Sequence, residues 1–306
     1  MNHLASSETK WTQNLVTLLM GFLVVFSLLA GSFVLTEPAA AENTDINIGY
    51  VNWASAEAST YVAEAVLEKR MDLNINLTMV DVGPVYTGLA EGDIDAFLAA
   101  WLPGTHKSYV EKFKDEIVKT GANFIGAKIG LVVPEYVDID SIKELNANAE
   151  KFDNKIVGID SGAGIMKATR KAIKHYNLDL KLISSSGPAM TAALKDAISN
   201  KEWVVVTGWK PHWKFAKWDL KFLKDPAKLY GTSENIYSFL HPGFSGEYPR
   251  VASFLHDFRM SSQQLGQVMG WIAEGTKPKA AAKRWVEENE KVVDSWLNPA
   301  DVSQLK

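Results

Sequence analysis

The chain has 306 residues, of which 47% are hydrophobic and 22% charged, a composition typical of a globular protein with one large or two ordinary domains. The net charge of −4 gives no indication of a nucleic-acid partner. The absence of cysteine excludes disulfide bonds, thiolate metal sites, cysteine nucleophiles and a lipid-carrying cysteine.

A long apolar segment near the N-terminus predicts a secretory signal peptide over residues 1–41. Residues 15–35 carry no charge, Lys10 precedes them, and Ala39 and Ala41 form a candidate cleavage site. The alternative is a retained membrane anchor, because the apolar run approaches spanning length. In either case we expect the folded part to begin near Asn43 and to lie in the periplasm.

Strand and helix patterns alternate along the first half of the remaining chain. Alternating apolar and polar residues predict strands, and apolar residues at helical spacing predict helices. We expect strands at 45–50, 76–82 and 96–100, and helices at 59–69 and 86–92. This alternation is typical of βα units with a mainly parallel sheet.

The pattern breaks near 128–134 (KIGLVVP) and then restarts. The second set has helices at 142–145, 163–176 and 189–199, and strands at 155–159, 180–183 and 203–207. The segment 261–296 is expected to be helical and to pack on the first set. Because the two sets share one order of elements, we predict an α/β protein in which lobe I comprises 45–133 and 230–306, and lobe II comprises 134–229.

Ligands of open α/β sheets bind beyond the carboxyl ends of the strands. A cleft between two such lobes is therefore expected to be lined by the loops that follow the strands. These loops are 51–55, 101–106, 160–164 and 208–213.

A tryptophan follows a predicted strand at three equivalent places, Trp53, Trp101 and Trp209. A trimethylammonium group has no N–H donor, so hydrogen bonds cannot hold it. Indole faces can hold it, each contributing roughly 0.5–2 kcal/mol or more when desolvated. The three residues are therefore candidates for an aromatic cage. The alternative is that their rings only pack at the interface between the lobes.

A zwitterionic ligand needs an anion subsite as well. The glycine-rich loop Gly158–Gly164 leads into a predicted helix, and free N–H groups at a helix N-terminus suit a carboxylate. His106 is a candidate donor to the same carboxylate. The alternative for His106 is a helix cap or a surface group.

Catalytic chemistry has little support in the sequence. It contains neither H-E-x-x-H nor G-x-S-x-G. No metal-ligand spacing relates the histidines His106, His175, His212, His241 and His256. We therefore expect no enzymatic activity, no cofactor and no metal. A hydrolase acting on choline-like substrates would need a nucleophile–base pair, which the predicted loops do not provide.

The chain resembles the OpuAC-type glycine betaine-binding proteins of ABC transporters over nearly all of residues 45–297. The motifs that carry the resemblance are GYVNWASAEAS, AAWLPGTHKSY, KIGLVVPEY, VGIDSGAGIM and TGWKPHW. The resemblance implies a type II periplasmic-binding-protein fold with the ligand in the cleft between the lobes. It also implies a cage of Trp53, Trp101 and Trp209, with a carboxylate subsite made of the Gly158 and Ile159 amides and His106.

The resemblance further implies a monomer that delivers glycine betaine to a membrane permease with its ATPase. The open alternative is another methylated osmolyte: proline betaine, dimethylsulfoniopropionate, carnitine, choline or trimethylamine N-oxide. Gly104 stands where some relatives carry a larger polar residue, which leaves the preferred ligand open. A carboxylate subsite favours betaines over choline.

Overall fold

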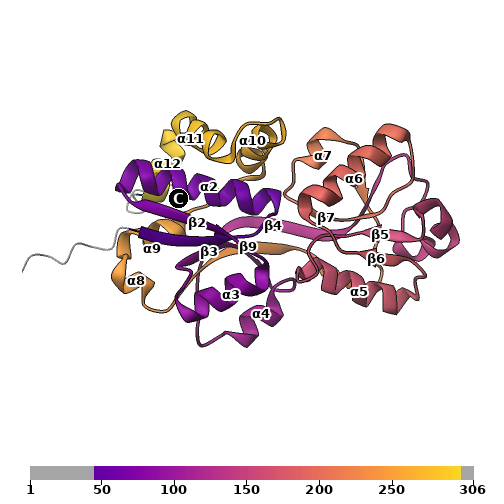
Figure 1. Cartoon of the computed structure of the whole chain (residues 1–306), viewed down its shortest axis with the longest axis horizontal. Coiled ribbons are helices and arrows are strands. Elements are labelled where there is room, and N and C mark those ends of the chain that lie inside the picture. The colour runs from indigo at the N-terminus through magenta and orange to yellow at the C-terminus, as the bar shows by residue number, and fades with distance from the viewer. Residues whose placement is uncertain (1–44, 298–306) are drawn as a thin grey trace, which may run out of the picture. The chain divides into compact units, whose positions relative to one another are not determined.

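The computed structural model describes residues 45–297, so the predicted signal peptide lies outside the described residues. In this range, no helix combines the length and the apolar character needed to cross a membrane. The strands form one continuous mixed sheet with the order β2-β1-β3-β9-β4-β7-β5-β6, and β8 pairs with β4 (Figure 1). The predicted α/β class is confirmed.

The first sheet region contains β1 (Asp45–Tyr50), β2 (Asn74–Met79), β3 (Ala96–Leu102), β9 (Glu234–Leu240) and the first part of β4. Strand β1 pairs in parallel with β2 and β3, as predicted, whereas β9 runs antiparallel to β3 and β4. The connecting helices are α2 (Ala54–Met71), α3 (Val82–Glu91) and the short α4 (Lys107–Lys112). Gly92 ends α3 in the left-handed conformation, φ 84°, which suits glycine.

Strand β4 (Val118–Pro134) crosses from the first sheet region to the second. Its first part pairs with β9 and its second part with β7 and β8. The predicted break at 128–134 is therefore wrong, because this segment is the second part of one 17-residue strand and is buried from Ile129 to Pro134. Gly126, with φ 83°, lies beside a register shift at which the pairing with β9 becomes irregular.

The second sheet region adds β5 (Lys155–Val157), β6 (Lys181–Ile183), β7 (Val206–Lys210) and β8 (Leu220–Phe222). Strand β5 is parallel to β6 and β7, whereas β4 is antiparallel to β7 and β8. Helices α5 (Gly164–Tyr176), α6 (Gly187–Asn200) and α7 (Lys214–Lys217) belong to this region, with two 3-10 helices at Ile142–Glu144 and Asn146–Phe152. The sheet is thus mixed, because β4 and β9 bring antiparallel pairing to the expected parallel cores. The predicted lobe boundaries stay a prediction.

The C-terminal helices pack on the first sheet region, as expected. They are α8 (Phe244–Glu247), α9 (Pro249–Asp257), α10 (Ser262–Ala273), α11 (Pro278–Glu288) and α12 (Glu290–Leu297). Figure 1 shows α10 and α11 beside α2. Lys279 of α11 donates hydrogen bonds to Glu64 at 3.0 Å and Glu68 at 2.6 Å on α2. Trp285 of α11 is fully buried and anchors this layer.

Candidate functional site

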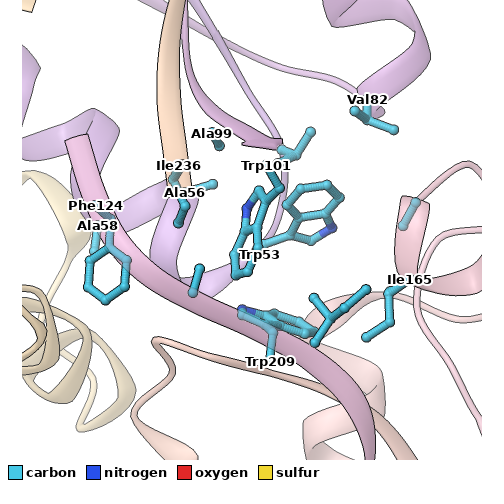
Figure 2. Close-up of a cluster of buried hydrophobic side chains, with 14 of the residues drawn as sticks. Trp53, Ala56, Ala58, Val82, Ala99, Trp101, Phe124, Ile165, Trp209 and Ile236 are labelled. Carbon is cyan, nitrogen blue, oxygen red and sulfur yellow. The ribbon is translucent and has the colours of Figure 1, made fainter. Parts of the chain in front are cut away.

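The three predicted tryptophans lie together, although they come from both sheet regions (Figure 2). Trp53 directly precedes α2, Trp101 pairs with Ile236 in β3–β9, and Trp209 pairs with Ile129 in β7–β4. Trp101 and Trp209 therefore lie inside strands rather than in the predicted loops. Their strands extend further because β9 and β4 continue to supply pairing partners. All three side chains are buried, with 6%, 3% and 4% exposure.

The tryptophan cluster, defined as Trp53, Trp101 and Trp209, borders a small cavity of about 20 Å³. Each of the four predicted loop ranges contributes to its wall, which carries no charged side chain. The lining residues are Trp53, Trp101, Thr105, Ile129, Ile159, Ala163, Gly164, Ile165 and Trp209. An apolar wall with three indole rings can hold a cation without N–H groups, because the ring faces supply the attraction.

A hydrogen bond from the Trp53 indole N–H to the Asp160 carboxylate, 2.8 Å long, fixes one ring of the cluster. Burial raises the pKa of Asp160, and the bond from Trp53 opposes that rise. The other carboxylate oxygen of Asp160 is buried without a hydrogen-bond partner among the described residues. A second bond between the regions runs from the Tyr109 hydroxyl to the Gly162 carbonyl at 3.0 Å.

His106 is fully buried and is neither a surface group nor a side-chain cap of α4. Its Nδ1 accepts the Trp101 backbone N–H at 3.3 Å and lies 3.3 Å from the Tyr86 hydroxyl. Burial lowers the pKa of His106 to about 3, so the ring is neutral and its proton is on Nε2. The Nε2–H has no acceptor among the described residues. His106 lies beside Trp53, with ring centroids 5.7 Å apart, but is outside the cavity lining.

The two predicted ligand amides differ in availability. The Gly158 N–H donates to the Ile183 carbonyl at 2.8 Å, so it is already paired in this conformation, and its binding of a carboxylate stays a prediction. A Cβ atom there would lie 2.3 Å from the Met166 sulfur and 3.0 Å from the Ile183 carbonyl oxygen, which favours glycine. The Ile159 N–H meets only that sulfur, at 3.3 Å, which is a weak acceptor. Of the pair, only Ile159 lines the cavity.

Glu234 shapes the site and was not predicted. Glu234 accepts the N–H groups of Gly104 at 3.0 Å and Thr105 at 2.8 Å, and so holds the turn after β3. A Cβ atom at Gly104 would lie 2.5 Å from the Glu234 carboxylate, which explains the glycine. Gly164 lies against Thr105, since a Cβ atom there would be 2.2 Å from its carbonyl oxygen. Glu234 is 129 residues from Thr105, and no local pattern indicates their contact.

Residues 44–288 match the protein family described as the substrate-binding domain of the ABC-type glycine betaine transport system. One curated relative is the glycine betaine/carnitine transport binding protein GbuC of Listeria monocytogenes, which is 42% identical over 162 residues. The match covers 52% of this chain and 53% of the relative, so it spans about half the length of that protein.

Two solved structures are similar over most of the chain. Lactococcal OpuAC, closed and complexed with glycine betaine, has a TM-score of 0.78 and 38% identity, covering 83% of this chain and 99% of that one. The glycine betaine/L-proline-binding protein ProX of Borrelia burgdorferi has a TM-score of 0.79 and 37% identity, covering 83% and 96%. The fold is thus that of type II periplasmic binding proteins. The chain belongs to the family of substrate-binding domains of ABC-type glycine betaine transport systems, which are binding proteins and not enzymes.

Proposed function

We propose that the protein captures glycine betaine, or a close betaine, and delivers it to the permease of an ABC importer. The observation that carries this proposal is the tryptophan cluster, in which two sheet regions supply indole rings to one uncharged cavity. The trimethylammonium group binds against the faces of Trp53, Trp101 and Trp209. The family match and the ligands named for GbuC, OpuAC and ProX support the same class of ligand.

The carboxylate of the ligand binds to donors that lack a good acceptor in the protein. The Nε2–H of His106 is buried and unpartnered within the described residues, and the Ile159 N–H has only a sulfur acceptor. A buried unpaired donor costs about 1–3 kcal/mol, so an anionic group that accepts from both is favoured. This subsite distinguishes betaines from choline, which has no carboxylate.

Ligand binding stabilises the closed arrangement of two lobes, because only that arrangement presents all three rings at once. The contacts that join the regions, Trp53 to Asp160 and Tyr109 to Gly162, belong to the closed form. The lobes are residues 45–133 with 230–306, and residues 134–229. The closed form then docks on the permease, which works with an ATPase, and the ligand leaves chemically unchanged.

The protein acts outside the cytoplasmic membrane, as a monomer. The family description of a transport-system binding domain supports this location, and so does the predicted leader over residues 1–41. A binding protein must meet its ligand on the side from which the importer takes it. Whether the leader is removed is decided by N-terminal sequencing of the exported protein.

Titration calorimetry of the full chain with glycine betaine, choline and trimethylamine N-oxide tests the proposal. We expect one-to-one binding of glycine betaine at micromolar or tighter affinity, with choline much weaker. Binding heat with only another methylated amine would support the proposed cage but identify another osmolyte as the ligand. No heat with any of these ligands would overturn the proposal.

A further inference from the structure

Lys214 is a fully buried lysine in contact with one ring of the tryptophan cluster. It begins α7, and its Nζ lies 4.5 Å from the centroid of the Trp209 ring and 5.8 Å from that of Phe215. Within residues 45–297, this Nζ has no hydrogen-bond partner. Lys214 does not line the cavity, so we place its Nζ on the face of the Trp209 ring that is turned away from Trp53 and Trp101.

The titratable groups around Lys214 do not neutralise its charge. The His212 ring accepts the Lys214 backbone N–H at 3.1 Å, and burial, followed by the charge of Lys214, lowers the pKa of His212 well below its usual value. The charged groups that lie over the aromatic rings near Lys214 are cations. Lys210 lies 4.6 Å from the Phe215 ring, and Lys217 lies 5.7 Å from the Trp213 ring. Lys128 lies on the Phe222 ring, which stacks on Phe215.

Burial alone lowers the pKa of Lys214 to about 7, because the charged amine has lost its water without gaining an anion. The amine therefore changes its charge near neutral pH. Burial also holds the pKa of His106 at about 3, so His106 stays neutral throughout this range. Lys214 is thus a group in contact with the Trp209 ring whose charge changes near neutral pH.

We propose that Lys214 sets the affinity of the tryptophan cluster for its cationic ligand and makes capture of that ligand dependent on pH. This role rests on the proposed function, because it requires a ligand cation on the cavity face of Trp209. An ammonium on one face of an indole ring attracts the same electron density that a cation on the other face needs. It also repels that cation directly.

The expected effect is measurable. With both cations in ring contact, their separation is about 9 Å, and at an effective dielectric constant of about 20 the repulsion weakens binding roughly 10- to 20-fold. Affinity is therefore low when Lys214 is charged and high when it is neutral. By reciprocity, the ligand favours the neutral amine, so binding near neutral pH releases a proton from Lys214.

The test is titration calorimetry of the full chain with glycine betaine between pH 5.5 and 9, for the wild type, Lys214→Met and Lys217→Met. We expect the wild-type affinity to rise roughly tenfold across this range. Lys214→Met should match the high-pH wild type at every pH, because methionine retains the length of the side chain without the charge. Lys217→Met, which removes a cation from the Trp213 ring, should follow the wild type.

A second measurement needs no variant. Titrations in buffers of different ionisation enthalpy should show proton release in the wild type near neutral pH. A flat wild-type affinity profile without proton release would overturn the role of Lys214 while leaving betaine binding intact. If a folded Lys214→Met variant showed the same pH dependence of betaine affinity as the wild type, that role would be overturned as well. Absence of binding in all variants at every pH would instead overturn the proposed function, and the role of Lys214 with it.

Discussion

The indole N–H of Trp53 donates a 2.8 Å hydrogen bond to Asp160, a residue 107 positions further along the chain in the other sheet region. One bond thus fixes a ring of the tryptophan cluster and joins the two regions beside the cavity. Asp160→Ala leaves the buried indole N–H unpaired, at a cost of about 1–3 kcal/mol, and should weaken betaine binding by at least about fivefold. Calorimetry measures this loss.

The matched control is Asp160→Asn, whose amide oxygen still accepts the Trp53 N–H. We expect it to bind nearly as tightly as the wild type. If Asp160→Asn were as weak as Asp160→Ala, the negative charge and not the hydrogen bond would be the important property of Asp160.

The rings of the cluster should dominate the affinity. Trp209→Ala removes an indole face and should weaken betaine binding at least tenfold with the fold intact. The control is Trp271→Ala on α10, where the ring contacts Arg284 at 4.0 Å and does not line the cavity. Unchanged affinity of Trp209→Ala would remove Trp209 from the proposed cage.

His106 should act on the carboxylate of the ligand. His106→Ala removes the Nε2–H donor and should weaken glycine betaine binding by about tenfold, the effect of one hydrogen bond to a charged group. Choline binding should change much less, because choline has no carboxylate. Measuring both ligands on one variant corrects for any general disturbance of the site, and equal losses would contradict the role of His106.

The close approach of Gly164 to Thr105 predicts that closure tolerates no side chain there. Gly164→Ala places a Cβ atom 2.2 Å from the Thr105 carbonyl oxygen, so the regions cannot meet as they do in the wild type. We expect weaker betaine binding with a nearly unchanged melting temperature. Gly266→Ala on α10 is the control, because no atom lies within 4 Å of its added Cβ, and it should bind normally.

Lys214 also links pH to stability. Because its pKa is lower in the folded protein than in the unfolded chain, the unfolded chain binds more protons above about pH 7. The stability of the folded state should therefore rise with pH from about 7 to 10, by at most about 1.4 kcal/mol per unit. Urea unfolding at several pH values tests this. The difference in unfolding free energy between the wild type and Lys214→Met should change over that range, and a constant difference would contradict it.

Local sequence patterns predicted most of the fold, because the periodicity of strands and helices depends on residues that are close together in the sequence. The elements from β1 to β3 and from β5 to α6 were predicted in order, as were the helical C-terminal segment and its packing, whereas α4 was not predicted. The continuity of β4 was not, because an apolar run such as KIGLVVP is ambiguous until β7 and β8 pair with it.

At the site, the positions of the tryptophans were predictable because strand ends converge at one edge. That reasoning fails where a contact with a residue far away in the sequence determines the local structure. Whether the Gly158 N–H is free depends on Ile183 in the next strand, and the turn at Thr105 depends on Glu234. The charge at Lys214 likewise depends on burial, which the motif TGWKPHWK does not reveal.

The continuous strand β4 limits how the two sheet regions can rotate against each other. Backbone pairing holds it to β9 as far as Ala127 and to β7 from Lys128 onward, and the Gly126 N–H donates to the Asn235 side chain at 3.2 Å. A rotation of one region against the other would therefore twist a paired ribbon, so its amplitude would depend on how far β4 can twist without losing its backbone hydrogen bonds.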